Sequence, residues 1–164
     1  MDTPILRRSR ISDAEALRDC VARVAREKRY LITVDGFSLE ETLAFLRRIE
    51  SEQLIQLVAT VDERIVGWCD ILPLEAPGFR HVGTLGLGVL AEWRGRGIGR
   101  QLIIQTIELA RTTGLEKIEL TVYSDNTRAM RLYESLGFEY EGRRRNARKL
   151  DGTYQDFLLM ALPL

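Results

Sequence analysis

The order of elements along the chain predicts an α/β fold, in which a mixed α+β sheet is flanked by about four helices. Strand-like runs joined by short turns predict a mostly antiparallel central sheet. Residues 80–123 read as strand, helix and strand, which implies one parallel pair with a right-handed crossover. The 164 residues contain no repeat, low-complexity tract or linker, so residues 1–164 are expected to form a single domain.

The first half of the chain predicts a strand, two helices and a hairpin. "SDAE" at 12–15 and "SLEE" at 38–41 each place Glu three residues after Ser, which is the capping-box pattern of a helix start. Apolar residues follow both at helical spacing, and a loop over 29–38 separates the two helices. The strands of this half are expected at 5–9, 54–61 and 65–72, the last two around a turn at 62–64.

The second half predicts alternating strands and helices that end in a hairpin. Gly114 and Gly137 are expected to end helices, because glycine readily takes the left-handed conformation that follows a helix C-terminus. The dipeptide Asp151-Gly152 is typical of tight hairpin turns. The expected elements are strands at 80–90, 117–123, 138–150 and 153–162 and helices at 98–113 and 125–137.

Composition and charge disfavour several classes of function. Lys plus Arg and Asp plus Glu each total 24, so the net charge is zero, whereas chains built to hold nucleic acid or anionic membranes usually carry excess positive charge. Cys20, Cys69 and the single histidine, His81, show no metal-ligand spacing, so no metal is expected. No run resembles a signal peptide or membrane span, which predicts a cytoplasmic protein without a membrane or nucleic-acid partner.

The stretch "EWRGRGIGRQL" at 92–102 places glycines and arginines where a helix is about to start. A helix N-terminus exposes unpaired N–H groups and a partial positive charge, and glycines leave these donors open. Arginines add forked, charge-assisted donors for an anion. The stretch therefore predicts a phosphate-binding loop made of Gly95, Gly97 and Gly99 with Arg94, Arg96 and Arg100.

Two common phosphate motifs do not account for this loop. The NTP-binding pattern GxxxxGK[ST] is absent from the sequence. "GLGVLA" at 86–91 matches GxGxxA, but that dinucleotide motif must open a helix at once, and Val89-Leu90 reads as strand. The pattern that remains is R-x-x-G-x-G at Arg94, Gly97 and Gly99, which follows a strand and opens a helix.

On these residues the chain resembles the GNAT superfamily of N-acetyltransferases. "VLAEWRGRGIG" is similar to the family's strand end and phosphate loop, "DNTRAMRLYESLGFEYEG" to its second signature and "GTYQDFLLMAL" to its closing hairpin strand. The resemblance covers about 81–162 and implies a GNAT fold over 1–164, with a splayed parallel strand pair. It also implies acetyl-CoA as the acyl donor, with its pyrophosphate on the glycine loop.

The resemblance implies where the donor lies. Its pantetheine arm enters the gap beside the strand "LGLGV", where Gly86 and Gly88 suit a bulge and a close backbone approach. A backbone N–H on this strand can also polarise the thioester carbonyl. The residues expected at acetyl-CoA are Leu87, Gly88, Val89, Arg94, Gly95, Arg96, Gly97, Ile98, Gly99, Arg100, Asn126, Ala129 and Tyr133.

The reaction implied is acyl transfer, in which a neutral primary amine attacks the thioester and the thiolate leaves. Tyr133 follows Asn126 by nearly two helical turns, so both lie on one helix face. By resemblance, Asn126 hydrogen-bonds the cofactor and Tyr133 faces its sulfur. A phenol with a pKa near 10 is protonated at neutral pH and can donate to the thiolate. Tyr133 is therefore expected to be the general acid, with a purely structural core aromatic as the alternative.

The general base has no clear candidate in the sequence. Many family members carry Glu on the strand before the loop, at the position that Gly83 occupies here. His81 lies two residues earlier on the same strand face, and its ordinary pKa of about 6.5 suits a base. Asp70 and Glu92 are weaker candidates. Asp70 and Tyr30 are also expected to contact the acceptor.

The acceptor is expected to be the primary amine of a small molecule, an amino acid or a protein N-terminus. The loop over 29–38 normally shapes the acceptor pocket in the family, and its sequence carries no recognisable code. The alternative function is a non-catalytic acetyl-CoA-binding sensor or scaffold, which is consistent with Gly83 in place of the usual Glu. A nucleic-acid module using the basic run at 143–149 fits poorly with zero net charge, and a homodimer is an open alternative.

Overall fold

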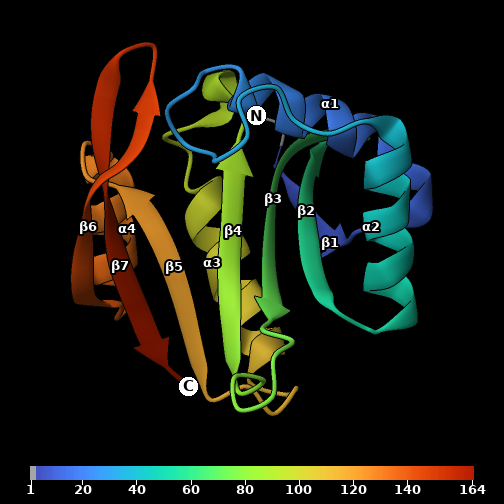
Figure 1. The fold of residues 1–164 in the computed structure, drawn as a ribbon. Helices are drawn as coiled ribbons and strands as arrows, with labels where there is room; N and C mark the ends of the chain where they lie inside the picture. Colours follow the sequence, from blue (N-terminus) through green and yellow to red (C-terminus); the bar gives the residue numbers. More distant parts are fainter. Residues whose placement is uncertain (1–2) are drawn as a thin grey trace.

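The computed structural model describes residues 3–164 and is organised around one seven-stranded sheet (Figure 1). The strands are β1 (Ile5–Arg8), β2 (Ile55–Val61), β3 (Arg64–Pro73), β4 (Val82–Val89), β5 (Lys117–Tyr123), β6 (Glu139–Leu150) and β7 (Thr153–Pro163). Their order in the sheet is β1-β2-β3-β4-β5-β7-β6. Neighbouring strands are antiparallel except β4 and β5, which are parallel, so the predicted sheet is confirmed.

Helices cover both faces of this sheet, as the alternation of elements predicted. They are α1 (Ala14–Ala25), α2 (Leu39–Ser51), α3 (Ile98–Ala110) and α4 (Thr127–Ser135), with 3₁₀ turns η1 (Ile11–Asp13) and η2 (Ala91–Trp93). In Figure 1, α3 lies behind β4, and its Leu102 packs beside Gly67 of β3. Val58, Val66 and Ile118 are fully buried at the centre of the sheet. The sheet is therefore an internal layer whose faces both contribute to the core.

The start of α1 differs from the prediction. Ser12 does not form the capping box expected from "SDAE"; instead, the Asp13 carboxylate accepts the Arg10 N–H at 2.8 Å and pairs with both terminal nitrogens of Arg7, each at 2.8 Å. A carboxylate bonded to a guanidinium makes stronger bonds than a serine hydroxyl. In residues 3–164, no side chain caps α1 itself. Arg7 lies on β1, so the bonds of Asp13 depend on a tertiary contact that the local pattern does not contain.

The second capping box is confirmed at α2. The Glu41 N–H donates to the Ser38 hydroxyl at 3.1 Å, and the Ser38 N–H donates to the Glu41 carboxylate at 2.7 Å. The turn Asp151-Gly152 between β6 and β7 is confirmed too, with φ of 49° and 79°. Within residues 3–164, no helix is both long enough and apolar enough to cross a bilayer.

The parallel pair β4 and β5 separates partway along its length, as the resemblance implied. Pairing extends only from Val82–Lys117 to Thr84–Glu119, whereas β4 stays paired with β3 as far as Val89. Figure 1 shows the two strands diverging from that point. The expected bulge in β4 is wrong, because the β3–β4 register is continuous. The gap between β4 and β5 therefore arises from loss of pairing on one side only.

Candidate functional site

A cavity of about 1240 Å³ is associated with this separation and contains most of the predicted site residues. Its walls come from the glycine loop, the start of α3, α4, α1, α2, the loop over 26–38 and the middle of the sheet. Predicted residues that line it are Tyr30, Asp70, Leu87, Gly88, Val89, Arg94, Gly95, Gly97, Ile98, Gly99, Arg100, Asn126, Ala129 and Tyr133. Arg96, His81 and Glu92 are outside its lining.

The glycine loop has the backbone geometry of an anion site. Gly95 and Gly97 have φ of 77° and 78°, in the left-handed region that side chains disfavour. Gly97 is the N-cap of α3, and among residues 3–164 no side chain caps this helix, which leaves its first-turn N–H groups for a ligand. The helix dipole adds partial positive charge at the same point. The loop therefore fits a phosphate-bearing group.

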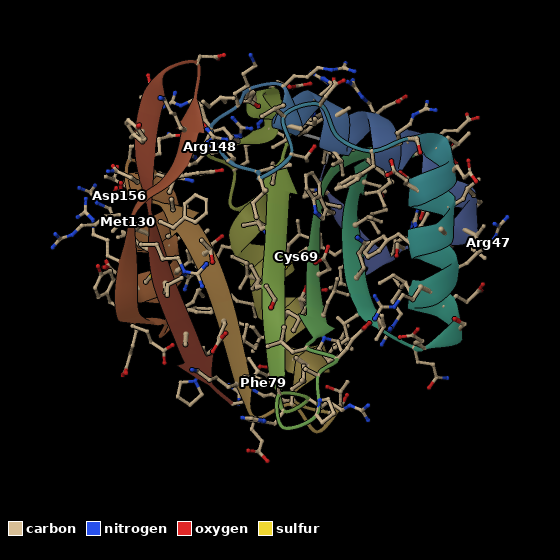
Figure 2. The ribbon with its side chains drawn as sticks, in the orientation of Figure 1. Arg47, Cys69, Phe79, Met130, Arg148 and Asp156 are labelled. Atoms are coloured by element: carbon tan, nitrogen blue, oxygen red, sulfur yellow. The ribbon has the colours of Figure 1, made fainter. Side chains whose placement is uncertain are left out.

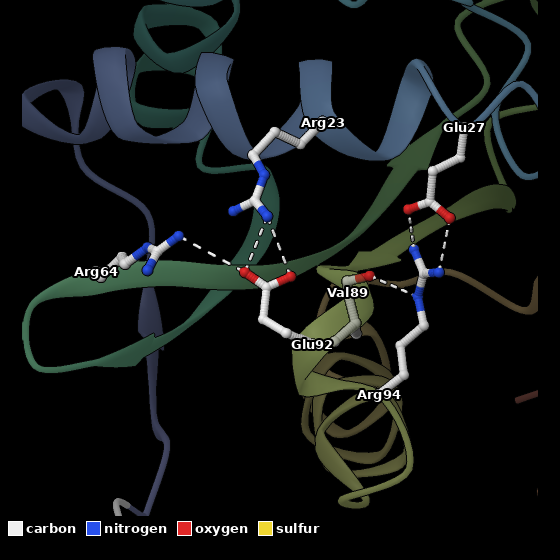
Figure 3. A network of polar contacts seen from close by, with 6 residues as sticks. All are labelled: Arg23, Glu27, Arg64, Val89, Glu92 and Arg94. Carbon is white, nitrogen blue, oxygen red and sulfur yellow. Dashed lines mark hydrogen bonds and ion pairs between the residues drawn. The ribbon is translucent and has the colours of Figure 1, made fainter.

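Arg94 does not have the free guanidinium that the sequence predicts (Figure 3). Its Nε donates to the Val89 carbonyl at 2.9 Å, and its two terminal nitrogens donate to the Glu27 carboxylate at 2.8 and 2.6 Å. The guanidinium also lies 4.6 Å from the centre of the Tyr30 ring. The hydrogen bond to Glu27 is the main reason that the pKa of Arg94 is raised. Arg94 therefore fastens the loop to the end of α1.

Other arginines remain around the loop. The Arg96 guanidinium stacks 4.6 Å from the centre of the Trp93 ring, and Arg100 donates to a serine hydroxyl of α4 at 2.9 Å. Arg128 lines the cavity, and its terminal nitrogen lies 3.2 Å from the point where a side chain on Gly95 would begin. Arg128 was not among the predicted residues, because an arginine in the first turn of a polar helix is indistinguishable by sequence from a solvated one.

Two of the predicted bases lie away from the cavity. The Glu92 carboxylate accepts from Arg23 at 2.9 and 3.1 Å and pairs with Arg64 at 3.6 Å (Figure 3). His81 is exposed just before β4, at the end that stays paired with β5, and its carbonyl accepts the Glu116 N–H at 2.8 Å. Neither side chain lines the cavity, so its geometry does not support either residue as the base.

The strand position expected to carry Glu has no room for one. A Cβ on Gly83 would lie 2.6 Å from Ile71 and 2.9 Å from Leu115, in the core. The next residue, Thr84, points to the opposite face and lines the cavity, but a hydroxyl is a poor base at neutral pH. β4 therefore carries no side chain that can act as the base, and the core leaves no room for one at position 83.

Tyr133 and Asn126 lie on the cavity side of α4, as predicted. Tyr133 is 7% exposed, and its ring meets Phe138 edge-on at a centroid distance of 5.6 Å. Burial, with a smaller contribution from Cys69, raises the pKa of Tyr133, so its phenol is protonated at neutral pH. The Asn126 side-chain oxygen accepts the Ala129 N–H at 3.2 Å and caps α4, which leaves its amide N–H groups for a ligand.

Two glycines of β4 make room for side chains of β3. Gly88 pairs with Trp68, and a Cβ on Gly88 would lie 2.1 to 2.7 Å from three atoms of the indole. Gly86 pairs with Asp70, and a Cβ there would lie 2.9 Å from the carboxylate. Trp68 and Asp70 therefore lie across the backbone of β4 and form part of the cavity wall.

Replacing Gly88 with alanine should lower the free energy of unfolding by roughly 1–3 kcal/mol, because the methyl group and the Trp68 ring cannot occupy the same space. Urea unfolding measures the change. Gly142→Ala is the matched control, since that strand glycine has its nearest neighbour at 3.8 Å and no positive φ. Equal stability of the two variants would contradict the close packing of Trp68 on Gly88.

Asp70 is the one predicted base that reaches the cavity. Its carboxylate accepts from the Gln56 side chain, the Nε2–Oδ2 distance being 3.2 Å, and Gln56 lies opposite it on β2. Burial raises the pKa of Asp70 to about 7, an effect that the Gln56 hydrogen bond opposes. At neutral pH this carboxyl group can therefore both accept and release a proton.

Side chains of β5 and β6 hold the loop over 26–38 at the cavity. The Tyr123 hydroxyl at the end of β5 donates to the Leu31 carbonyl at 3.1 Å. Arg148, labelled in Figure 2, stacks 4.4 Å from the Tyr123 ring centre and donates to the carbonyls of Leu31 and Lys28. Arg148 belongs to the basic run at 143–149, so part of that run has a structural role.

Comparisons with known proteins agree with this geometry. A profile of the acetyltransferase (GNAT) family matches residues 22–138. L-amino acid N-acetyltransferase AaaT of Escherichia coli (strain K12) is 30% identical over 162 residues, which cover 98% of each chain. An acetyltransferase of the GNAT family from Streptococcus pneumoniae has a TM-score of 0.92 at 27% identity, covering 99% of this chain and 100% of that chain.

A second solved structure shares the fold. The putative acetyltransferase yncA from Salmonella typhimurium, with its cofactor acetyl-CoA, has a TM-score of 0.92 at 21% identity, and the match covers 98% of this chain and 94% of that chain. Together with the family profile and the curated relative, this agreement confirms the resemblance predicted from the two sequence signatures. The chain belongs to the acetyltransferase (GNAT) family.

Proposed function

We propose that this protein is an N-acetyltransferase that moves the acetyl group of acetyl-CoA to the primary amine of a small molecule, an amino acid or a protein N-terminus. One observation carries the proposal. The same cavity is lined by an open glycine loop, a splayed strand pair and the buried phenol of Tyr133. The relative AaaT, which is named for L-amino acids, favours an amino acid among these acceptors.

The residues present fit acetyl-CoA. The N–H groups at the start of α3 and the guanidinium of Arg128 on α4 suit its pyrophosphate. Arg100 lies on the first turn of α3. Leu87 and Val89 lie on the unpaired side of β4, where their backbone groups can bond the pantetheine arm. Arg94 contributes by positioning the loop, since its side chain is already bonded to Glu27.

Tyr133 is the proposed general acid. The amine nitrogen forms a bond to the acetyl carbon while the carbon–sulfur bond breaks, and the phenol donates its proton to the departing thiolate. A backbone N–H of β4 beside the cavity stabilises the negative charge on the carbonyl oxygen. The raised pKa keeps the phenol protonated for this step.

Calorimetric titration of acetyl-CoA into the purified protein tests the proposal without a guess about the acceptor, with NAD as the control ligand. We expect one-site binding with a micromolar Kd, followed by thiol release when amines are added. Binding without thiol release for any amine would favour the sensor or scaffold function. Absence of binding would overturn the proposal.

The domain organisation, the localisation and the oligomeric state are also part of the proposal. The seven strands form one sheet, which supports a single GNAT domain over residues 1–164. In residues 3–164, no group of three or more His, Cys, Asp or Glu side chains is arranged to hold a metal. Cytoplasmic localisation stays a prediction from the sequence, and size-exclusion chromatography distinguishes a monomer from the homodimer.

A further inference from the structure

Two oxygen acceptors lie side by side where the cavity meets the middle of β2 and β3. Gln56 is 2% exposed, and its Nε2 donates to Asp70 at 3.2 Å. Its Oε1 is buried, and among residues 3–164 it has no hydrogen-bond partner. A buried amide oxygen without a donor destabilises the fold, so its presence on a cavity wall points to a ligand that donates.

The charge at this point is also unbalanced. Asp70 forms no ion pair with any residue in 3–164, and the only hydrogen bond to its carboxylate in that range comes from neutral Gln56. A carboxylate held away from water is stable only with a compensating charge or a proton. A protonated primary amine supplies a positive charge and three N–H donors, which match the Asp70 carboxylate and the Gln56 Oε1.

The position of the pair places such an amine beside the reacting group. A Cβ on Gly86 would lie 2.9 Å from the Asp70 Oδ1, so this oxygen lies over the backbone of β4. Gly86 is in the part of β4 that has separated from β5, next to the residues proposed for the pantetheine arm. An amine held by Asp70 is therefore next to the expected place of the thioester.

The cavity lining is largely apolar, although Arg18, Arg29, Thr33, Glu41 and Thr42 also contribute to it. Apolar side chains from α1, α2, β3 and the loop over 26–38 contribute to it. They include Leu17, Val21, Phe45, Leu72, Leu31 and Phe37. A group attached to the amine thus meets hydrocarbon and aromatic surface, which favours an apolar substituent.

We infer that Gln56 and Asp70 bind the ammonium group of the acceptor, that Asp70 is the base that deprotonates it, and that the acceptor is a primary amine bearing an apolar group. This inference rests on the N-acetyltransferase function proposed above. It assigns a base inside the cavity, whose lining includes neither His81 nor Glu92.

The proton transfers balance in four steps. The ammonium gives one proton to the Asp70 carboxylate, and the neutral amine attacks the acetyl carbon as the carbon–sulfur bond breaks. The thiolate takes the Tyr133 proton. The acetylated nitrogen then loses its second proton to the Tyr133 phenolate through water. Asp70 releases its proton to solvent, so one proton is produced for each acetyl group transferred.

The test compares Asp70→Asn with the wild type on two nucleophiles of similar shape. Benzylamine is protonated at neutral pH, whereas O-benzylhydroxylamine is neutral and needs no base before attack. We expect the variant to lose at least about 100-fold in kcat/KM with benzylamine and less than about tenfold with O-benzylhydroxylamine. Asp62→Asn, the same change in an exposed turn, should change neither value.

A second variant tests the binding role. Gln56→Met removes the amide with little change in volume, and we expect it to raise KM for benzylamine by about tenfold with a smaller change in kcat. An effect confined to kcat would contradict the role of Gln56 in binding the ammonium group. The Kd for acetyl-CoA should stay within about threefold of the wild-type value in both variants.

Other outcomes overturn the inference. Equal losses on the two nucleophiles would mean that Asp70 is only structural, and unchanged activity would remove it from the reaction. A wild-type enzyme that acetylates spermidine or glycylglycine but not benzylamine would refute the apolar acceptor and leave the proposed function intact. Failure to bind acetyl-CoA would refute the proposed function itself, and this inference with it.

Discussion

Replacing Tyr133 with phenylalanine is expected to lower kcat by roughly 10- to 10⁴-fold while leaving the affinity for acetyl-CoA nearly unchanged. The change removes only the hydroxyl, so the edge-on contact with Phe138 and the packing of α4 are kept. The lost rate reflects a thiolate that must leave without a proton from the protein. Steady-state kinetics with an active amine and calorimetry with acetyl-CoA measure the two quantities separately.

The control for this change is Tyr140→Phe. Tyr140 lies on β6 and is 56% exposed, so removal of its hydroxyl should affect neither kcat nor Kd. Because burial raises the pKa of Tyr133, loss of its proton should not limit the wild-type rate anywhere between pH 6 and pH 9. An unaltered kcat in Tyr133→Phe would show that the thiolate leaves without this phenol.

The variant Asp70→Asn is expected to be more stable than the wild type at pH 8, even though it should be the less active enzyme. Burial raises the pKa of Asp70 from its ordinary value of 3.8 to about 7. The folded protein therefore binds this proton more tightly than the unfolded chain does, and ionisation of Asp70 destabilises the fold as pH rises from about 4 to about 7. Asparagine has no such ionisation.

The size of this difference in stability follows from the shift in the pKa of Asp70. The difference in unfolding free energy between the variant and the wild type should be small near pH 4 and should grow to at most about 4 kcal/mol at pH 8. Urea unfolding of both proteins at several pH values measures it. All other groups titrate in both proteins, so the difference isolates Asp70. A difference that does not change with pH would contradict the buried carboxylate.

Asp13→Asn provides a control in which the change in the free energy of unfolding has the opposite sign. Although burial acts to raise the pKa of Asp13, its bonds to Arg7 and to the Arg10 N–H lower it overall. This carboxylate stabilises the fold above its ordinary pKa, and the stabilisation is lost as pH falls. Asp13→Asn should therefore be less stable than the wild type at pH 7, and the gap should narrow in acid.

The local patterns predicted most of the fold and the donor side of the site. The glycine loop depends on backbone freedom and on the start of one helix, both of which are contained in the stretch "WRGRGIG". The positions of Asn126 and Tyr133 on one face of α4 follow from helical spacing alone. The capping box at Ser38 and the turn at Asp151 are likewise local, and the structure confirms both.

The partners of charged groups were not predictable, because they come from distant parts of the chain. The sequence predicts Arg94 as a phosphate ligand. In the structure its guanidinium is bonded to Glu27, 67 residues away. The cap expected at Ser12 does not form, and the neighbouring Asp13 carboxylate is bonded to Arg7 of β1. Local sequence shows that a charge is present, but only the fold shows which opposite charge is close enough to pair with it.

The sequence by itself determined the family, the fold class and the glycine loop that we propose for acetyl-CoA, because these rest on short-range spacing. Only the tertiary structure decided which of the candidate bases lines the cavity. The register of β2, β3 and β4 brings Gln56, Asp70 and Gly86 into one row across the sheet, while the core closes the position of Gly83. A strand register brings together residues far apart in the chain, and no local pattern encodes that alignment.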